Sequence, residues 1–264
     1  MKNDYLERQL SIIEDNDNVE KTNEVGNFFI LISGIVGVFL AIVLSLSFIA
    51  EIFINIMPIK MKYNIENTIS TLIDIDKRID SSYSDKKEQL NYLKTIIIKN
   101  DKELKAYSNI KIEVIKSDEY NAWVLPNGEI HFTTTLLNDN FTQEELTYIL
   151  AHEIGHYKNR DALKSISKSI ISMVVASLMG TDINANTSTI ITNASFFERI
   201  SYSKNKEKKA DRYSAKMLKK LYGNTNGAIS ALKKMDNRNK ASEFYHYFSS
   251  HPSPKERIRY IKRI

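Results

Sequence analysis

The chain has 264 residues, enough to bury a sizeable core in one or at most two domains. It contains no cysteine, so disulfide bridges and thiolate sites are excluded. The formal net charge of +5 is spread along the chain without a basic patch interleaved with aromatic residues, so we expect no nucleic-acid partner.

The first predicted element is a transmembrane anchor at residues 28–50, preceded by a polar N-terminal tail at residues 1–27. The anchor segment is 23 residues without a charge, rich in Ile, Leu, Val and Phe. As a helix it measures about 34 Å, enough to cross a hydrocarbon core. The run is too long for a cleaved signal peptide, and the tail before it is acidic and polar. A buried core helix is the alternative to a single-pass anchor in the lipid bilayer.

A domain at residues 60–264 is expected after the anchor, beginning with membrane-proximal helices at residues 62–107. This stretch is rich in lysine, and its apolar residues recur at helical spacing. One apolar stripe comprises Ile65, Ile69, Leu72, Ile73 and Ile79, and a second comprises Leu90, Leu93, Ile97 and Leu104.

Three short strands are predicted next, at Lys111–Ile115, Ala122–Leu125 and Ile130–Thr134. Asn127-Gly128 between the second and third is a strong signal for a two-residue hairpin turn. The pattern therefore predicts a small antiparallel sheet, which could also be an ordinary structural hairpin.

The most specific pattern is His152-Glu153-Ile154-Gly155-His156, an H-E-x-x-H motif. Residues four apart on a helix share one face, so both imidazoles can reach the same metal ion, and Glu153 can act as a general base toward a bound water. Surface histidines in solvent are the alternative for a bare match. Thr142 and Glu145 fit a capping box at the start of this helix, and the apolar positions that follow recur at helical spacing.

A third metal ligand should come from another element, and Glu207 is the best candidate. Asp211 lies one helical turn further and could accept the free N–H of a ligating histidine. A solvated helix in which Glu207 pairs with Lys204 or Lys208 is the alternative, and Glu198 is a chemically suitable rival ligand.

Between these two parts lies the apolar stretch Ile166–Met179, which Lys168 interrupts and which is too short for a second span. We expect it to form a helical hairpin with a helix at Ile190–Tyr202 through the polar loop 181–189. That hairpin would cover the cleft as a lid or dip into the bilayer interface. Residues 225–264 are expected to form short helices, with Pro254 starting the last one.

Four blocks resemble the family of membrane-associated zinc metallopeptidases that includes HtpX, the CAAX prenyl endopeptidases and the mitochondrial and periplasmic quality-control proteases. They occur in the family's order within Asn121–Ile258, about half the chain. The blocks are N-A-W-V-L-P-N-G with I-H-F-T-T, A-H-E-I-G-H, S-K-N-K-E-K-K-A-D and H-P-S-P-K-E-R-I. One departure is Lys204, which stands where the family usually has arginine.

The resemblance implies an α+β, mainly α, zincin-like (gluzincin) fold, with a small sheet before the H-E-x-x-H helix and a transmembrane helix ahead of both. It implies roles for residues in all four blocks. The implied zinc ligands for one Zn²⁺ per chain are His152, His156 and Glu207; the general base is Glu153; Asp211 and Arg257 support the ligands; His251 steadies the oxyanion; and Asn121, Ala122 and Trp123 form the strand that pairs with substrate.

Some alternatives stay open at this stage. A histidine beside prolines is often a turn residue, which is the other interpretation of His251. His131 and His246 match no ligand position and are interpreted as surface or satisfied structural residues.

The function expected from the sequence is a membrane-anchored zinc endopeptidase that cleaves misfolded or membrane-proximal polypeptides. A non-catalytic chaperone or assembly factor on the same zinc fold is the alternative, although a scaffold would not need Glu153. A prenyl-peptide protease would need an intramembrane chamber of several helices, which one span cannot build. Arg8 and Lys21 before the span balance Lys60 and Lys62 after it, so charge does not give the orientation. Analogy with single-anchor relatives favours an extracytoplasmic catalytic domain.

Overall fold

The computed structural model describes residues 23–71, 79–104, 109–178, 200, 202–239, 251 and 253–264. Contacts between residues divide the chain into two units, Met1–Leu46 and Ser47–Ile264. Helix α2, Glu24–Ile56, runs through the boundary between them. The functional residues named above all belong to the second unit.

Helix α2 contains the predicted anchor. Within the described residues it is the one helix that is long and apolar enough to cross a membrane, with a mean hydropathy of 2.8 over its most apolar window and none of that window buried. A polar group on it, the Ser33 hydroxyl, donates to the Phe29 carbonyl at 2.7 Å and so needs no outside partner. By length and composition α2 is a candidate membrane span.

Helices follow the anchor, as the lysine-rich pattern predicted. They are α3 at Ile59–Thr71, a 3₁₀ turn η2 at Ser81–Tyr83, and α4 at Ser84–Asn100. The second apolar stripe is confirmed for Leu90, Leu93 and Ile97, which lie on α4 and are buried in the main core. Leu104 is buried in the same core but lies beyond the end of α4.

The end of the first stripe is predicted wrongly. Ile79 is not helical but forms an isolated antiparallel bridge with Ile115. The backbone N–H of the next residue, Asp80, donates to the Val114 carbonyl at 2.8 Å. The extended backbone here therefore satisfies its polar groups against the first strand instead of within a helix.

The sheet has three strands, β1 at Lys111–Ile115, β2 at Ala122–Val124 and β3 at Glu129–Thr133. The predicted antiparallel hairpin is confirmed, since β2 pairs antiparallel with β3. Its loop has three residues, 126–128, and not the predicted two, because the Leu125 N–H donates to the Glu129 carbonyl and the Gly128 N–H donates to the Leu125 carbonyl. Gly128 in its turn has φ of +88°, a left-handed conformation that glycine adopts without strain. A Cβ there would also lie 2.9 Å from Cζ of Tyr157.

The prediction of a wholly antiparallel sheet is wrong. The strand order is β1-β3-β2, and β1 runs parallel to β3. The cause is the connection 116–121 between β1 and β2. It leaves a gap of one strand between them, and β3 fills that gap. Because β3 lies between the two earlier strands, it opposes β2 and runs with β1, so the sheet is mixed.

Helix α6, Gln143–Lys158, follows the sheet after the short α5, Thr134–Leu137. Its predicted capping box is confirmed: the Glu145 N–H donates to Thr142 Oγ1 at 3.3 Å, and the Thr142 N–H donates to Glu145 Oε2 at 2.7 Å. Nearly every residue from Glu145 to Tyr157 is buried, which makes α6 the central helix of the domain.

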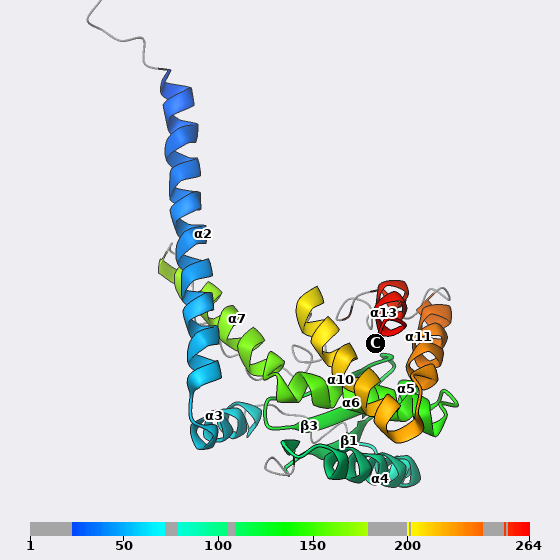
Figure 1. Cartoon of the computed structure of the whole chain (residues 1–264). Coiled ribbons are helices and arrows are strands. Elements are labelled where there is room, and N and C mark those ends of the chain that lie inside the picture. Colours follow the sequence, from blue (N-terminus) through cyan, green and yellow to red (C-terminus); the bar gives the residue numbers. More distant parts are fainter. Residues whose placement is uncertain are drawn as a thin grey trace, which may run out of the picture. The chain divides into compact units, whose positions relative to one another are not determined.

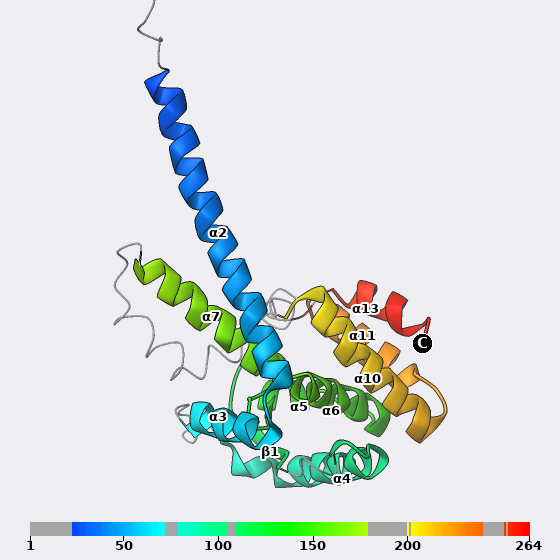
Figure 2. The same ribbon diagram turned by 60° about the vertical axis from the view of Figure 1, so that its left-hand side comes forward.

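The remaining described helices are α7 at Asp161–Leu178, α10 at Lys204–Tyr222, α11 at Asn226–Asn239 and α13 at Pro254–Ile261. Figure 1 shows α6 between two layers, with α10, α11 and α13 on one side and the sheet and α4 on the other. The turned view in Figure 2 keeps the same order.

Helices α6 and α10 approach each other very closely at one point. A Cβ on Gly155 would lie 3.0 Å from the Cα of Ala210, so the two small residues allow the backbones to come together. Gly155 lies between His152 and His156 on α6, and Ala210 lies three residues after Glu207 on α10. The close approach of the two helices therefore brings the two histidines within reach of Glu207.

The described part of the domain is thus mostly helical with a small mixed sheet, in keeping with the predicted α+β, mainly α class. The apolar stretch Ile166–Met179 lies in α7 up to Leu178. Most of the predicted partner helix at Ile190–Tyr202 lies outside the described residues, and its end is wrong because Ile200 and Tyr202 are not helical.

Candidate metal centre

The middle of α6 brings three functional side chains into the core. His152 and Glu153 are each 1% exposed and His156 is fully buried. The two imidazoles face each other edge to face, and their Nε2 atoms are 3.1 Å apart. The Nε2 atoms of both rings therefore point at the same small volume, as the four-residue spacing predicted.

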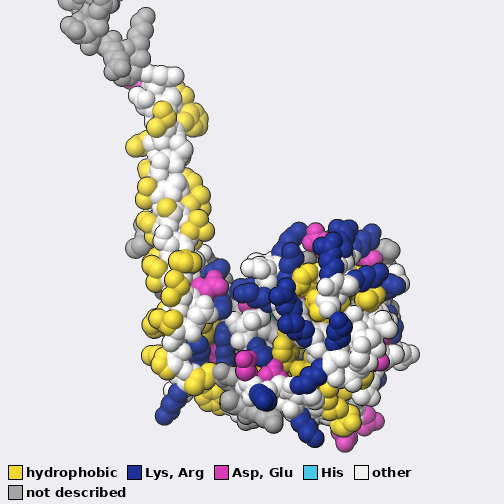
Figure 3. Space-filling view, in the orientation of Figure 1, with side chains coloured by type: hydrophobic (Ala, Val, Ile, Leu, Met, Phe, Trp, Pro, Cys, Tyr) yellow, Lys and Arg dark blue, Asp and Glu magenta, His cyan; other side chains and the backbone are white. Residues whose placement is uncertain are grey.

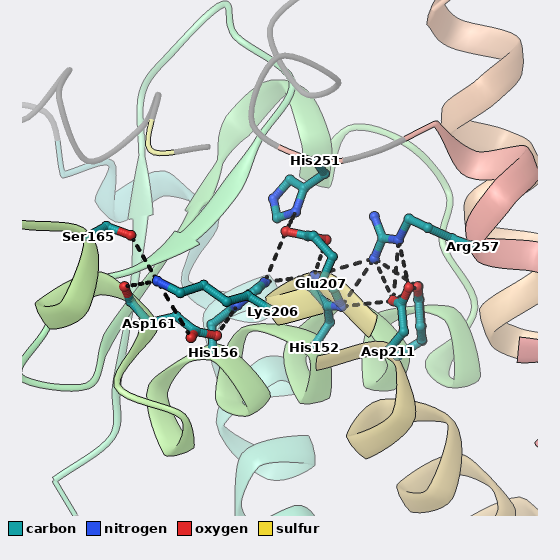
Figure 4. Close-up of polar contacts among 10 residues, drawn as sticks. His152, His156, Asp161, Ser165, Lys206, Glu207, Asp211, His251 and Arg257 are labelled. Atoms are coloured by element: carbon teal, nitrogen blue, oxygen red, sulfur yellow. Dashed lines mark hydrogen bonds and ion pairs between the residues drawn. The ribbon is translucent and has the colours of Figure 1, made fainter. Parts of the chain in front are cut away.

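Glu207 on α10 points into the same volume. Its Oε2 lies 3.5 Å from His152 Nε2, and its Oε1 lies 3.4 Å from His156 Nε2. Its side chain is only 1% exposed, whereas Lys204 pairs with Glu256 at the surface. The solvated-helix alternative for Glu207 is therefore wrong. Figure 4 shows Glu207 at the centre of the cluster, between the histidines of α6 and His251.

His251 supplies a fourth donor to the cluster. Its Nδ1 lies 2.8 Å from Glu207 Oε1, and the residue is 4% exposed. Together with His152, His156 and Glu207 it offers ligand atoms that all lie within 4.8 Å of one another. The structure thus brings this histidine next to the motif, which argues against the simple turn residue.

A network behind His152 fixes the orientation of its ring. Asp211 Oδ1 lies 3.0 Å from His152 Nδ1 and accepts from the Tyr148 hydroxyl at 2.8 Å. The Arg257 guanidinium donates to the same carboxylate at 2.8 Å and to the Tyr148 hydroxyl at 2.9 Å. All of these groups are buried, so Asp211 and Arg257 form an ion pair whose remaining hydrogen-bonding capacity is directed at the histidine.

Asp161 plays the corresponding part for His156 and was missed by the sequence reasoning. It starts α7, and its Oδ2 lies 2.9 Å from His156 Nδ1. Arg160, just before it, has φ of +57°, the one non-glycine residue with positive φ in the described part of the chain. That sharp turn directs the Asp161 carboxylate back toward the histidine five residues earlier, a geometry that no sequence motif signals.

Tyr202 was also missed as a site residue. Its ring stacks on His156 with 4.2 Å between the centroids. It also packs with Trp123 and Leu125 of the sheet region and with Ile166 of α7. Tyr202 therefore covers one side of the histidine cluster and connects it to the sheet.

The charged groups of the cluster shift one another's pKa values. Burial alone would lower the pKa of His156, but hydrogen bonds to Asp161 and Glu207 raise it to about 10. Burial alone would raise the pKa of Glu207, but His251, His152 and His156 hold it well below its usual value. The pKa of Asp211 is likewise depressed, because the Arg257 guanidinium outweighs the effect of burial.

The donor set fits a divalent metal ion. Within the described residues, the buried atoms Glu207 Oε2 and Glu153 Oε1 accept no hydrogen bond. Leaving carboxylate oxygens buried without partners is costly, and a bound cation with its water is the partner that such a group of imidazole and carboxylate ligands selects. The ligands would be His152, His156 and Glu207, with His251 within reach as a fourth.

The predicted substrate strand lies beside this centre. Asn121 precedes β2, which contains Ala122 and Trp123 and pairs on one side with β3. In the described sheet β2 is therefore an edge strand, the position at which an extended peptide can add.

The remaining predicted residues do not join the centre. His131 is fully buried on β3 and its Nε2 lies 2.7 Å from Glu129 Oε1, which is a structural role. Glu198, the rival third ligand, and His246 lie outside the described residues.

Comparison with known proteins agrees with this geometry. The profile of peptidase family M48 matches residues 87–264, which contain every residue of the cluster. The metalloprotease YcaL of Escherichia coli (strain K12) is 24% identical over 157 residues, 58% of this chain and 61% of the relative. The mitochondrial metalloendopeptidase OMA1 of Schizosaccharomyces pombe is 25% identical over 198 residues, 72% of this chain and 58% of the relative. The OMA1 of Danio rerio is 47% identical over a short stretch of 45 residues, 17% of this chain and 9% of the relative. The chain therefore spans about three fifths of the length of the first two relatives.

Proposed function

Because the chain belongs to peptidase family M48, we propose that it is a membrane-anchored zinc endopeptidase with one Zn²⁺ held by His152, His156 and Glu207. The observation that carries the proposal is the convergence of these three buried ligands beside a second carboxylate, Glu153, which has a buried oxygen without a hydrogen-bond partner in the described residues. A structural site would need ligands alone. A carboxylate beside them with an oxygen that accepts no hydrogen bond is what general-base catalysis requires.

When bound, the zinc ion would polarise the scissile carbonyl and acidify the attacking water. Glu153 would take the proton from that water and pass it to the amine of the leaving peptide. One buried oxygen of Glu153 accepts no hydrogen bond in the described residues, whereas Glu207 and Asp211 have their charges held by histidine and arginine.

The supporting carboxylates would hold the two histidine ligands in the required tautomer. Asp211 accepts at Nδ1 of His152, and Asp161 accepts at Nδ1 of His156, so Nε2 of each ring is left with its lone pair toward the metal. Arg257 keeps Asp211 ionised and aimed at His152.

Access to the centre would require His251 and Tyr202 to move. The motif residues are at most 1% exposed, and these two side chains lie directly against them. A catalytic zinc site keeps one ligand position open, so His251 would leave Glu207 before substrate enters. In the opened site its imidazole would donate to the oxygen of the carbonyl under attack, the role implied by the resemblance.

The substrates proposed are misfolded or membrane-proximal polypeptides in extended conformation. Main-chain pairing with the β2 edge, along Asn121, Ala122 and Trp123, would align a peptide without selecting for particular side chains. Folded segments cannot offer a free main chain, and an anchor at residues 28–50 would confine the enzyme to chains near the bilayer.

The test uses the full chain purified in a neutral detergent, with unfolded casein as substrate. We expect zinc near one per chain by elemental analysis, cleavage that a chelator abolishes and zinc restores, and retained zinc with no cleavage in Glu153→Gln. Glu145→Gln is the matched control, because it removes an equally buried carboxylate from the same helix at a distance from the metal ligands.

A non-catalytic scaffold is the second candidate function, favoured by the fourth donor. Four protein ligands around one zinc ion are typical of structural sites. If the scaffold is correct, zinc will be retained and no Glu153-dependent cleavage will be seen, even in His251→Ala, where the fourth position has been opened. Absence of zinc from the folded wild-type chain would contradict both candidates.

We propose that the catalytic domain lies outside the cytoplasm. The chain has no cysteine, so a single introduced cysteine can be labelled specifically to test this. A single cysteine in place of the exposed Lys216 should react with a membrane-impermeant maleimide added to intact cells. Labelling only after the cells are broken would place the domain on the cytoplasmic side.

A further inference from the structure

A polar cavity lies outside the metal-ligand cluster, near the C-terminal end of α2. Its accessible volume is about 370 Å³, room for about twelve water molecules. Its wall is formed by the end of α2, the start of α3, residues 103 and 104 after α4, the end of α6 with the start of α7, and one residue from α10. Asp161 is the one side chain that lines this cavity and also contacts a histidine of the metal cluster.

The lining is rich in positive charge. Its basic residues are Lys62, Lys158, Arg160, Lys164 and Lys209, and its acidic residues are Glu51, Glu103 and Asp161. In the view of Figure 3, lysine and arginine side chains gather beside the C-terminal end of α2 and continue across the neighbouring face of the domain.

Two of these basic residues already have carboxyl partners among the described residues. Lys158 pairs with Asp101 and with Glu103, and Arg160 donates to the fully buried Glu66 at 2.8 Å.

The charge that remains belongs to three lysines. In the described part of the chain, Lys62, Lys164 and Lys209 have no carboxylate within ion-pairing distance, and Lys62 donates only to the Asn55 carbonyl, at 3.0 Å. Burial, together with Lys209 and Lys62, lowers the pKa of Lys164 in spite of Asp161 and Glu51. Ammonium groups that line one cavity without an ion-pair partner gain from an anion placed among them.

The position of the cavity suggests the source of that anion. The predicted anchor ends at Ala50, and the lining residues Glu51 and Asn55 occupy the next turns of the same helix. Asn55 lies roughly 7 Å beyond Ala50 along the helix, which is about the thickness of the headgroup layer on one side of a bilayer. Phe53 and Ile56 are exposed on this part of α2, as suits a segment that meets lipid.

We propose that this cavity binds a phosphate group, supplied either by the headgroup of an anionic phospholipid or by a soluble phosphate. Lys62, Lys164 and Lys209 provide the charge, and the partly buried Arg160 and the exposed Asn55 line the same space. A phosphate that carries a glycerol-sized substituent fits the volume. The site is separate from the metal ligands, so the proposal does not depend on proteolysis.

The experiment measures binding to the full chain in dodecyl maltoside micelles. Native mass spectrometry follows titration with dioctanoyl phosphatidylglycerol, and dioctanoylglycerol serves as the phosphate-free control with the same acyl chains. Inorganic phosphate is titrated separately by calorimetry. We compare wild type with Lys62→Glu/Lys164→Glu and with Lys216→Glu/Lys233→Glu, which makes the same change in net charge at exposed positions on α10 and α11.

We expect one saturable phosphatidylglycerol per chain, no saturable dioctanoylglycerol, and at least tenfold weaker binding in the cavity variant alone. Saturable inorganic phosphate with the same dependence on the variants would identify the soluble source. Equal weakening in both double variants, or no saturable binding of either phosphate, would overturn the proposal. Circular dichroism and zinc content verify folding, and Lys62→Gln/Lys164→Gln replaces the glutamate variant if that variant does not fold.

Discussion

Two glutamates on α6, eight residues apart, differ in what surrounds them. Glu145 and Glu153 are each 1% exposed. Glu145 accepts from the Thr142 N–H at 2.7 Å, from the Ser230 hydroxyl at 2.5 Å and from Lys234 Nζ at 2.7 Å. Glu153 has a buried oxygen that accepts from no group in the described residues. The hydrogen bonds of Glu145 offset the free-energy cost of burying its carboxylate, whereas one buried oxygen of Glu153 has no such compensation.

The difference separates stability from function within a single helix. A fully partnered buried carboxylate stabilises the fold, because removing it leaves Lys234 and the helix N-terminus without their acceptor. An unpartnered one destabilises the fold and is retained only where its basicity is used. Substitutions at the two positions should therefore have opposite effects on activity and on stability.

Glu153→Gln should give the largest effect on activity, a fall in kcat/KM of roughly 10²–10⁴-fold. The amide cannot take a proton from water, although it preserves the shape of the side chain. The melting temperature should stay the same or rise, since a buried ionised oxygen without a hydrogen-bond donor is removed. Glu145→Gln should leave kcat/KM within a few-fold of wild type, and equal losses in the two variants would remove the contrast.

Glu207→Gln should weaken zinc retention by more than roughly 100-fold, because the amide lacks the charge that faces three histidines. Competition with a chromogenic chelator measures this affinity. Glu256→Gln is the control, since it removes a half-exposed carboxylate that pairs with Lys204 at the surface. Unchanged zinc affinity in Glu207→Gln would return the third-ligand role to Glu198.

Local chemistry explains which of these features could be predicted from the sequence. The capping box, the Asn127-Gly128 hairpin and the facing histidines all depend on residues a few positions apart, where helix and turn geometry decide the outcome. The resemblance of four blocks extended this to Glu207, Asp211, His251 and Arg257, which lie far apart in the chain but close together in the structure.

The features that could not be predicted depend on how elements are arranged in space. The parallel pairing of β1 with β3 follows from the order of the strands, which alternation of apolar residues does not encode. Asp161 reaches His156 only because Arg160 adopts a left-handed backbone conformation, and Tyr202 stacks on His156 only through tertiary packing. The lysine cavity likewise draws its lining from five helices and the segment after α4.

Substitutions at the N-terminal end of α6, where Thr142 and Glu145 form the capping box, should change the stability of the fold more than the activity. Glu145→Ala should lower the free energy of unfolding by about 2 kcal/mol, and Thr142→Ala by about 1 kcal/mol, because each removes part of the capping box and the first also strands Lys234. Urea denaturation followed by circular dichroism measures both. Gln143→Ala, at an exposed neighbouring position, should change stability by much less. A loss of activity at constant stability in Thr142→Ala would contradict this division of the helix.

Glu66 offers the smallest effect and extends the comparison to a third buried glutamate, one that is only half satisfied. It accepts from Arg160 at 2.8 Å, but its other oxygen has no partner in the described residues, and burial raises its pKa from 4.5 to about 7. The folded state therefore holds a proton that the unfolded chain has lost above pH 4.5, so this group makes the protein less stable as the pH rises toward 7. Between pH 6 and pH 7.5 the loss should be about 1 kcal/mol. Urea unfolding at several pH values should show this decline in wild type and a flatter profile in Glu66→Gln, whose amide does not titrate. Parallel profiles for the two proteins would mean that Glu66 is ionised in the fold across this range and that Arg160 fully compensates for its burial.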